Sequence, residues 1–135
     1  MITPEQVSEL LVQACPSFRA ARDETVKLYG EETIYGVAGP LAHHLLSLYR
    51  AADTREFAAV GAIIERLHVE GDHYVAEFAT IGILEGIQNV WANNGVEPDE
   101  FVPFLGPVSR TWWDSLNRFW RGELRYVGED VPPNL

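Results

Sequence analysis

The stretch from Thr54 to Trp91 limits the possible folds most strongly, because it reads as two helices in tandem. The first is TREFAAVGAIIERLHVE and the second is DHYVAEFATIGILEGIQNVW, and the two meet at Gly71-Asp72. The second helix is apolar almost all round and carries Gly82 and Gly86 about one turn apart. A helix that is apolar on every side is buried, and paired glycines indicate that neighbouring backbones approach it closely. This pattern predicts the centre of a compact helical domain, and it is not the pattern of an active site.

Helix signals also occur on both sides of this stretch. Thr3 is the expected N-cap of the first helix, with Pro4 at the first helical position and Gln6 completing a capping box. Gly71 is the expected C′ glycine of one central helix, and Asp72 is the expected N-cap of the next. Further helices are predicted over 4–15, 17–29, 40–52 and 107–122, with a stop at Gly30, a loop over 31–39 and a short helix or turn pair over 98–105.

No segment shows the period-two alternation of a β-strand. The chain has 135 residues, of which 47 % are apolar and 22 % charged, and this suits one globular domain. We therefore predict an all-α fold, a single compact bundle of six or seven antiparallel helices over residues 1–125. The polar residues 126–135, which include Pro132-Pro133, are expected to form a loose C-terminal tail.

The last helix is rich in aromatic residues. Its predicted core face consists of Val108, Trp112, Leu116 and Phe119. Trp113 and Trp120 fall at one margin of that face, where two interpretations remain open. They are either rim packing or an exposed aromatic anchor, and the second matters because tryptophan is enriched at binding hot spots.

Acidic residues are both numerous and unevenly placed. The net charge is −10, which argues against binding to a nucleic-acid backbone, since that needs a basic patch. No Lys or Arg lies between Arg66 and Arg110, whereas seven acidic residues do. This base-free stretch is either a solvated acidic face or a surface that recognises a basic protein.

The chain lacks the marks of a membrane or secreted protein. No apolar run approaches the roughly 20 residues that a membrane span needs. The first ten residues contain Pro4, Glu5 and Glu9 and no basic region, unlike a secretory signal. The single cysteine, Cys15, cannot form an internal disulfide and is expected to be a small buried hydrophobe. Together these features predict a cytoplasmic protein.

Motifs for catalysis or cofactor binding are not found in the sequence. It has no Walker loop, GxGxxG, nucleophile elbow, HExxH or CxxC, so we expect no catalytic, cofactor or metal residue. A metal site could be composed from His68, His73 and Glu77 with His43 or His44, but the His43-His44 pair is expected to face mostly solvent. Glu65, Glu77 and Glu85 are candidate acid/base carboxylates, and solvated charge is the simpler interpretation.

The central helix pair resembles a known repeat unit. The block ERLHVEGDHYVAEFATIGILEGI is similar to the helix-turn-helix unit of HEAT or armadillo-like repeats, with Asp72, Val75 and Ala79 in the matching places. Ala76 stands where such units often have an Arg. The resemblance covers one unit, and a solenoid needs at least three, so it implies a HEAT/armadillo-like centre within a bundle.

A second resemblance is to a family of small, uncharacterised, all-helical bacterial proteins. It is carried by CPSF at 15–18, IERLHVEGD at 64–72, ATIGILEGIQN at 79–89 and FLGPVSRTWWDSLNRFW at 104–120. Such proteins are similar to immunity proteins of polymorphic toxin systems, and the resemblance supplies no catalytic residues.

The expected function is therefore a non-enzymatic, protein-binding one, of the immunity type, in which the domain blocks a toxin's catalytic domain. The alternatives are a helical scaffold or regulator of another protein, and a small metal-dependent hydrolase in which His68, His73 and Glu77 converge in a pocket. The partner would carry a basic surface. The predicted partner-binding residues are Glu77, Glu85, Asp99, Glu100, Trp113 and Trp120.

Overall fold

Helix-forming segments account for all the regular structure in a computed structural model, which describes residues 1–29 and 34–135. The α-helices in these ranges are α1 (Pro4–Ala14), α2 (Arg19–Tyr29), α3 (Ala38–Arg50), α4 (Phe57–Glu70), α5 (His73–Glu77), α6 (Glu85–Asn93) and α7 (Pro107–Trp120). The 3₁₀ helices η1 (Pro16–Phe18), η2 (Ile34–Val37) and η4 (Pro98–Phe104) and the π-helix η3 (Phe78–Leu84) connect them. The predicted all-α bundle is confirmed. The stop predicted at Gly30 and the first part of the predicted loop lie outside the described residues.

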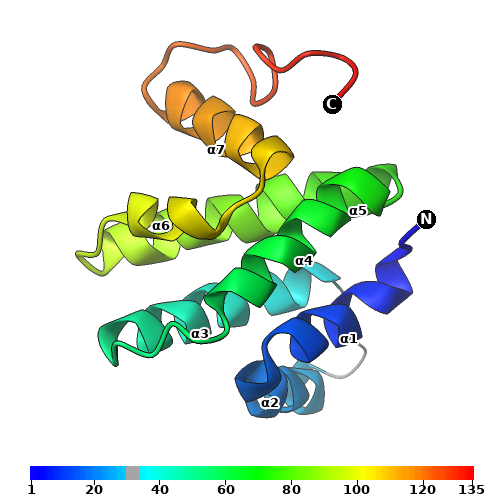
Figure 1. The fold of residues 1–135 in the computed structure, drawn as a ribbon, viewed down its shortest axis with the longest axis vertical. Helices are drawn as coiled ribbons and strands as arrows, with labels where there is room; N and C mark the ends of the chain where they lie inside the picture. The colour runs from blue at the N-terminus through cyan, green and yellow to red at the C-terminus, as the bar shows by residue number, and fades with distance from the viewer. Residues whose placement is uncertain (30–33) are drawn as a thin grey trace.

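The molecule is built around α4, with α1 and α2 at one end and α7 with the C-terminal segment at the other (Figure 1). The long helix predicted after Asp72 runs from α5 through η3 to α6, so it is continuous but widened at its centre. None of the helices in the described ranges is long and apolar enough to cross a membrane.

The turn between α4 and α5 is closed by the N-terminus of the chain. The Asp72 side chain accepts a hydrogen bond from the Val75 N–H at 2.8 Å, which confirms the predicted N-cap. Gly71 has a φ of −73°, so the predicted C′ glycine geometry is wrong. Instead, the Ile2 N–H donates to the Glu70 carbonyl at 2.7 Å and the Asp72 N–H donates to the Ile2 carbonyl at 2.9 Å. Glycine is needed at 71 because a Cβ there would lie 2.3 Å from the Leu67 carbonyl oxygen.

An aromatic cluster forms the core where α4, α6 and η4 meet. Phe57 packs edge-on against Phe101 and Phe104, and its ring centroid lies 6.4 Å from that of Trp91. The Trp91 indole N–H donates to the Ala42 carbonyl at 3.2 Å, so this buried polar group is satisfied. The cluster therefore joins α3 to the central helices through one tryptophan.

The buried face of α7 differs from the predicted one. Leu116 is buried as expected, but Trp112 and Phe119 are half-buried, and Trp113 is only 1 % exposed. The Trp113 indole N–H donates to Asp99 at 2.8 Å, which draws this side of the helix toward η4. The prediction assumed one core face, whereas α7 is covered on two sides, by the bundle and by the C-terminal segment.

Candidate functional site

A pocket of about 680 Å³ lies between the end of α4, α5, η3, α7 and the C-terminal segment. Its wall is mainly apolar and aromatic, with Ile81, Trp112, Phe119, Tyr126, Val127 and Leu135 among its residues. His68, His73 and Glu77 also line it, so the three residues named for the hydrolase alternative do share one pocket. A concave, mostly apolar site with a few polar groups is the usual form of a ligand pocket.

A chain of four hydrogen-bonded side chains lies behind this pocket. The Ser109 hydroxyl donates to the Glu65 carboxylate at 2.8 Å, and the same carboxylate accepts the Val108 and Ser109 N–H groups at the start of α7. Because the Ser109 proton is used in this way, its oxygen accepts from Nδ1–H of His68 at 3.0 Å. The other ring nitrogen, Nε2, then accepts from the Thr80 hydroxyl at 2.8 Å.

This series of hydrogen bonds determines the protonation state of His68. Both ring nitrogens are engaged, and burial lowers the pKa of the imidazole to about 4, with the Glu65 carboxylate opposing that shift. His68 is therefore neutral at pH 7 and has no free lone pair for a substrate or metal. Among residues 1–29 and 34–135, His68, His73 and Glu77 do not form a group that could share a metal ion. The shared pocket agrees with the hydrolase alternative, but His68 is not available in it as a general base or a metal ligand.

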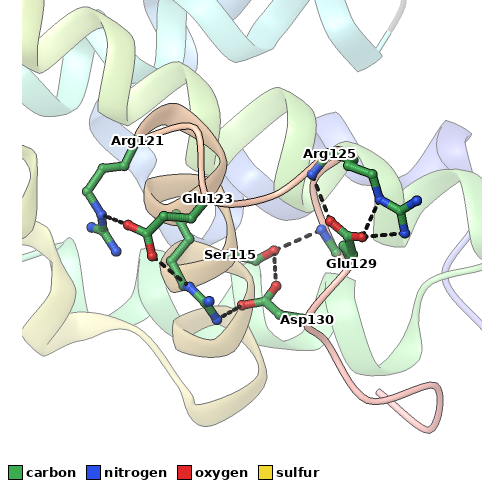
Figure 2. A network of polar contacts seen from close by, with 8 residues as sticks. Ser115, Arg121, Glu123, Arg125, Glu129 and Asp130 are labelled. Carbon is green, nitrogen blue, oxygen red and sulfur yellow. Dashed lines mark hydrogen bonds and ion pairs between the residues drawn. The ribbon is translucent and has the colours of Figure 1, made fainter.

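The C-terminal segment forms one wall of the pocket through Arg125, Tyr126, Val127, Pro133 and Leu135. Polar contacts hold this segment against α7 (Figure 2). The Ser115 hydroxyl donates to Asp130 at 2.7 Å and accepts the Gly128 N–H at 2.8 Å. Arg118 pairs with the other Asp130 oxygen at 2.9 Å. Gly128 has a φ of +95°, and a Cβ there would lie 2.6 Å from the Trp112 ring. Glycine is therefore required for the segment to pass this close to the indole.

A second polar cluster joins the α1–α2 turn to α3 and to the start of α4. Glu56 accepts the Ser17 N–H at 3.1 Å and the Cys15 thiol at 3.2 Å, and it also accepts the Ser17 hydroxyl. The Ser17 oxygen lies 2.7 Å from Nε2 of His44. Since the hydroxyl proton goes to Glu56, Nε2–H of His44 donates to Ser17.

Sequence reasoning missed this cluster. His44 was expected to face mostly solvent, but it is half-buried, and its ring lies tilted against that of Phe18 with the centroids 5.8 Å apart. That expectation is therefore wrong for His44, while His43 is exposed. Cys15 is buried as predicted, yet its sulfur contacts polar groups. No local signal marks the cluster, because its members come from three segments that only the tertiary fold brings together.

The protonation states of the cluster follow from its environment. Burial, helped by the hydrogen bond to Glu56 and by the charge of that carboxylate, raises the pKa of the Cys15 thiol to about 11, against a lowering by the hydrogen bond with Ser17. Burial lowers the pKa of His44. Burial acts to raise the pKa of Glu56, but the hydrogen bonds from Ser17 and Cys15 outweigh it, so this pKa is lower than usual. At pH 7 the cluster thus holds a thiol, a neutral imidazole and a carboxylate.

The six predicted partner-binding residues do not form one surface. Glu77, Asp99 and Glu100 are exposed and Glu85 is half-buried. Trp120 is 53 % exposed, whereas Trp113 is buried, so Trp113 contributes packing and not an exposed anchor. Asp99, in η4, accepts the Trp113 indole N–H, and so it lies beside α7.

Glu77 and Glu85 lie near two tyrosines that no sequence pattern singles out. Burial raises the pKa of Tyr35, and the charges of Glu77 and Glu85 act in the same direction, so both carboxylates lie within electrostatic reach of its phenol group. Tyr35 and Tyr74 are both exposed, with ring centroids 5.9 Å apart. Tyr35, Tyr74, Glu77 and Glu85 together make up a tyrosine–glutamate surface.

Comparison with known proteins identifies a family. Residues 8–121 match the family described as Domain of unknown function (DUF7674), and the chain belongs to this family. The comparisons with curated proteins and with solved structures found no match.

Proposed function

We propose that this member of the DUF7674 family binds a protein with a basic surface, and that it acts as an immunity-type inhibitor of a toxin's catalytic domain. The single observation that carries the proposal is the set of carboxylates without a cationic partner in the base-free stretch between Arg66 and Arg110. In the described residues, Glu77, Glu85, Glu97, Asp99 and Glu100 form no ion pair.

Acidic residues elsewhere in the described chain are paired more often, although Glu5, Glu24, Glu56, Glu65 and Asp114 also form no ion pair. Glu9, Asp53, Glu123, Glu129 and Asp130 each pair with an arginine. Within the base-free stretch only Glu70 is paired, with Arg66 at its edge. The negative charge is therefore neutralised least in the base-free stretch, and we expect a basic partner to approach there. A negative potential of this kind speeds association with a basic protein and selects among partners.

The tyrosine–glutamate surface is the best-supported contact region. Tyr35 and Tyr74 offer aromatic area at small entropic cost, since tyrosine has few rotatable bonds. Glu77 and Glu85 add charge beside that area. Tyrosine is enriched among the residues that contribute most to binding energy, and carboxylates beside it would pair with Lys or Arg of a basic partner. Inhibition would follow when a toxin domain docks here and its active site is covered.

Co-expression with the product of the adjacent gene tests the proposal. We expect a tight one-to-one complex on affinity purification and relief of the neighbour's toxicity in growing cells. A complex without protection would favour the scaffold or regulator alternative. The absence of both a complex and protection would contradict the proposal.

Charge reversal tests the surface itself. Glu77→Lys and Glu85→Lys should each weaken the complex, by roughly tenfold, and make its affinity less sensitive to salt. The matched control is Glu24→Lys, because Glu24 is exposed on α2, far along the chain from the base-free stretch. Circular dichroism confirms that each variant is folded. An affinity and salt slope equal to those of Glu24→Lys would reject this surface.

A further inference from the structure

We propose that Cys15, His44 and Glu56 form a binding site for a thiophilic divalent cation, with Zn²⁺ as the best-matched ion. The inference is independent of the acidic surface and of the proposed partner. It begins from the convergence of three different ligand types, one from each of three segments: the end of α1, the middle of α3 and the residue before α4.

The donor atoms of these residues are close enough to share one ion. The sulfur, a ring nitrogen and a carboxylate oxygen all lie within 4.8 Å of one another. In tetrahedral zinc sites with the usual bond lengths, neighbouring donor atoms are about 3.4–3.6 Å apart. The Cys15 sulfur is 3.2 Å from a Glu56 oxygen, which is within a few tenths of an ångström of that spacing.

Ser17 completes the geometry. Its hydroxyl oxygen lies 2.7 Å from Nε2 of His44 and 3.7 Å from the Cys15 sulfur, and it also contacts Glu56. This oxygen, or a water that replaces it, is placed to be a fourth ligand. Ser17 is exposed while Cys15 is fully buried, so an ion would enter from the serine side and reach the sulfur last.

The donor set selects the class of ion. One thiolate, one imidazole and one carboxylate match Zn²⁺, whereas Mg²⁺ and Ca²⁺ prefer oxygen ligands alone. On binding, the Cys15 S–H bond breaks, its proton leaves to solvent and a sulfur–metal bond forms. The His44 ring proton moves from Nε2 to Nδ1 by exchange with water, which frees Nε2 as a ligand without changing the charge of the ring.

The site would connect the α1–α2 turn to α3 and α4. These segments are held at this point by hydrogen bonds of Ser17 and Cys15 to Glu56. A bound ion replaces these contacts with metal bonds, and because it binds only the folded chain it stabilises that state.

Cobalt substitution provides a direct test. We would remove any bound metal from the full-length protein with a chelator and titrate it with Co²⁺. Zn²⁺ would then displace the cobalt, and absorbance spectroscopy and calorimetry would follow both steps. The expected result is one ion per chain, a thiolate-to-cobalt charge-transfer band in the near ultraviolet, and loss of that band on addition of zinc. Absence of the band at saturating cobalt would overturn the assignment of Cys15.

Variants assign the other ligands. Cys15→Ser should abolish the band, and His44→Gln and Glu56→Gln should each lower zinc affinity by more than about 100-fold, beyond the loss typical of a residue that only supports a ligand. His43→Gln is the matched control, because it removes the adjacent, exposed histidine. An equal loss of affinity in His43→Gln, or undiminished affinity in both His44→Gln and Glu56→Gln, would overturn the site even if Cys15→Ser fails to fold.

Discussion

His68 shows that the state of a single residue depends on distant neighbours. Its partners Thr80 and Ser109 lie 12 and 41 positions away in the sequence. They use both ring nitrogens, and burial holds the imidazole neutral. Its neighbour across the turn, Asp72, has a role that the sequence predicted correctly, because an N-cap depends only on the next three residues.

The depressed pKa of His68 predicts a pH-dependent stability. Folded His68 titrates near 4 and the unfolded residue near 6.5, so between these values the unfolded state binds more protons. Its contribution is fully present above pH 6.5 and is lost as the pH falls toward 4, by about 3 kcal/mol in total. Urea unfolding at pH 7.5, 6 and 5 measures this loss.

The His68→Gln variant isolates the contribution of the histidine from that of other groups. Its amide can still hydrogen-bond but does not titrate, so its stability should fall less steeply between pH 7.5 and 5. His44→Gln serves as a comparison, since burial also lowers the pKa of His44. Parallel pH profiles for wild type and His68→Gln would show that His68 does not titrate as the structure indicates.

At the scale of elements, the π-helix η3 is the largest departure from the expected pattern. The sequence predicts one regular helix from Asp72 to Trp91, and the structure widens it over Phe78–Leu84. Gly82 lies against the Phe78 ring, and a Cβ there would be 2.5 Å from a ring carbon. Thr80 lies in this segment and contacts His68. Widened turns of this kind occur often at functional sites, and this one lines the pocket.

Close packing between α4 and η4 gives a prediction for Gly61, with Gly39 in α3 as the comparison. A Cβ at Gly61 would lie 1.8 Å from the Phe104 carbonyl oxygen, which is backbone and cannot rotate away. We expect Gly61→Ala to destabilise the protein by about 3 kcal/mol, at the upper end for overpacking. Gly39, in α3, has nothing within 4 Å of its Cβ position. Gly39→Ala should therefore be neutral or stabilise by up to about 1 kcal/mol. Thermal unfolding of the two variants tests the contrast, and similar melting temperatures would contradict it.

At the scale of the whole molecule, the C-terminal segment contacts α7 and closes the pocket. The sequence predicts that residues 126–135 form a loose tail, and this prediction concerns the motion of the segment. The structure shows the Gly128 N–H donating to Ser115, and Ser115 donating to Asp130. Val127 packs against the edge of the core.

Hydrogen exchange decides how firmly this segment is held. We expect the Gly128 amide to exchange more slowly than an unfolded amide, and Ser115→Ala to remove that protection and cost about 1–2 kcal/mol through two lost hydrogen bonds. Ser47→Ala is the control, since Ser47 is an exposed serine on α3. Unprotected exchange at Gly128 in the wild type would support the loose tail predicted from the sequence.

The sequence by itself determined the all-α class and most of the helix boundaries. These depend on local periodicity, on prolines and on caps, all of which act within a few residues. The capping contact between the Thr3 N–H and Gln6 at 2.9 Å and the start of α7 at Pro107 are examples.

The tertiary structure alone decided which side chains meet. Cys15 and Glu56 are 41 positions apart, as are His68 and Ser109, and no local pattern encodes either pairing. It also decided which side of α7 is buried, because the C-terminal segment covers a face that periodicity assigns to the core. Local structure follows from neighbouring residues, whereas a site is formed by distant segments whose contact depends on how all the helices pack.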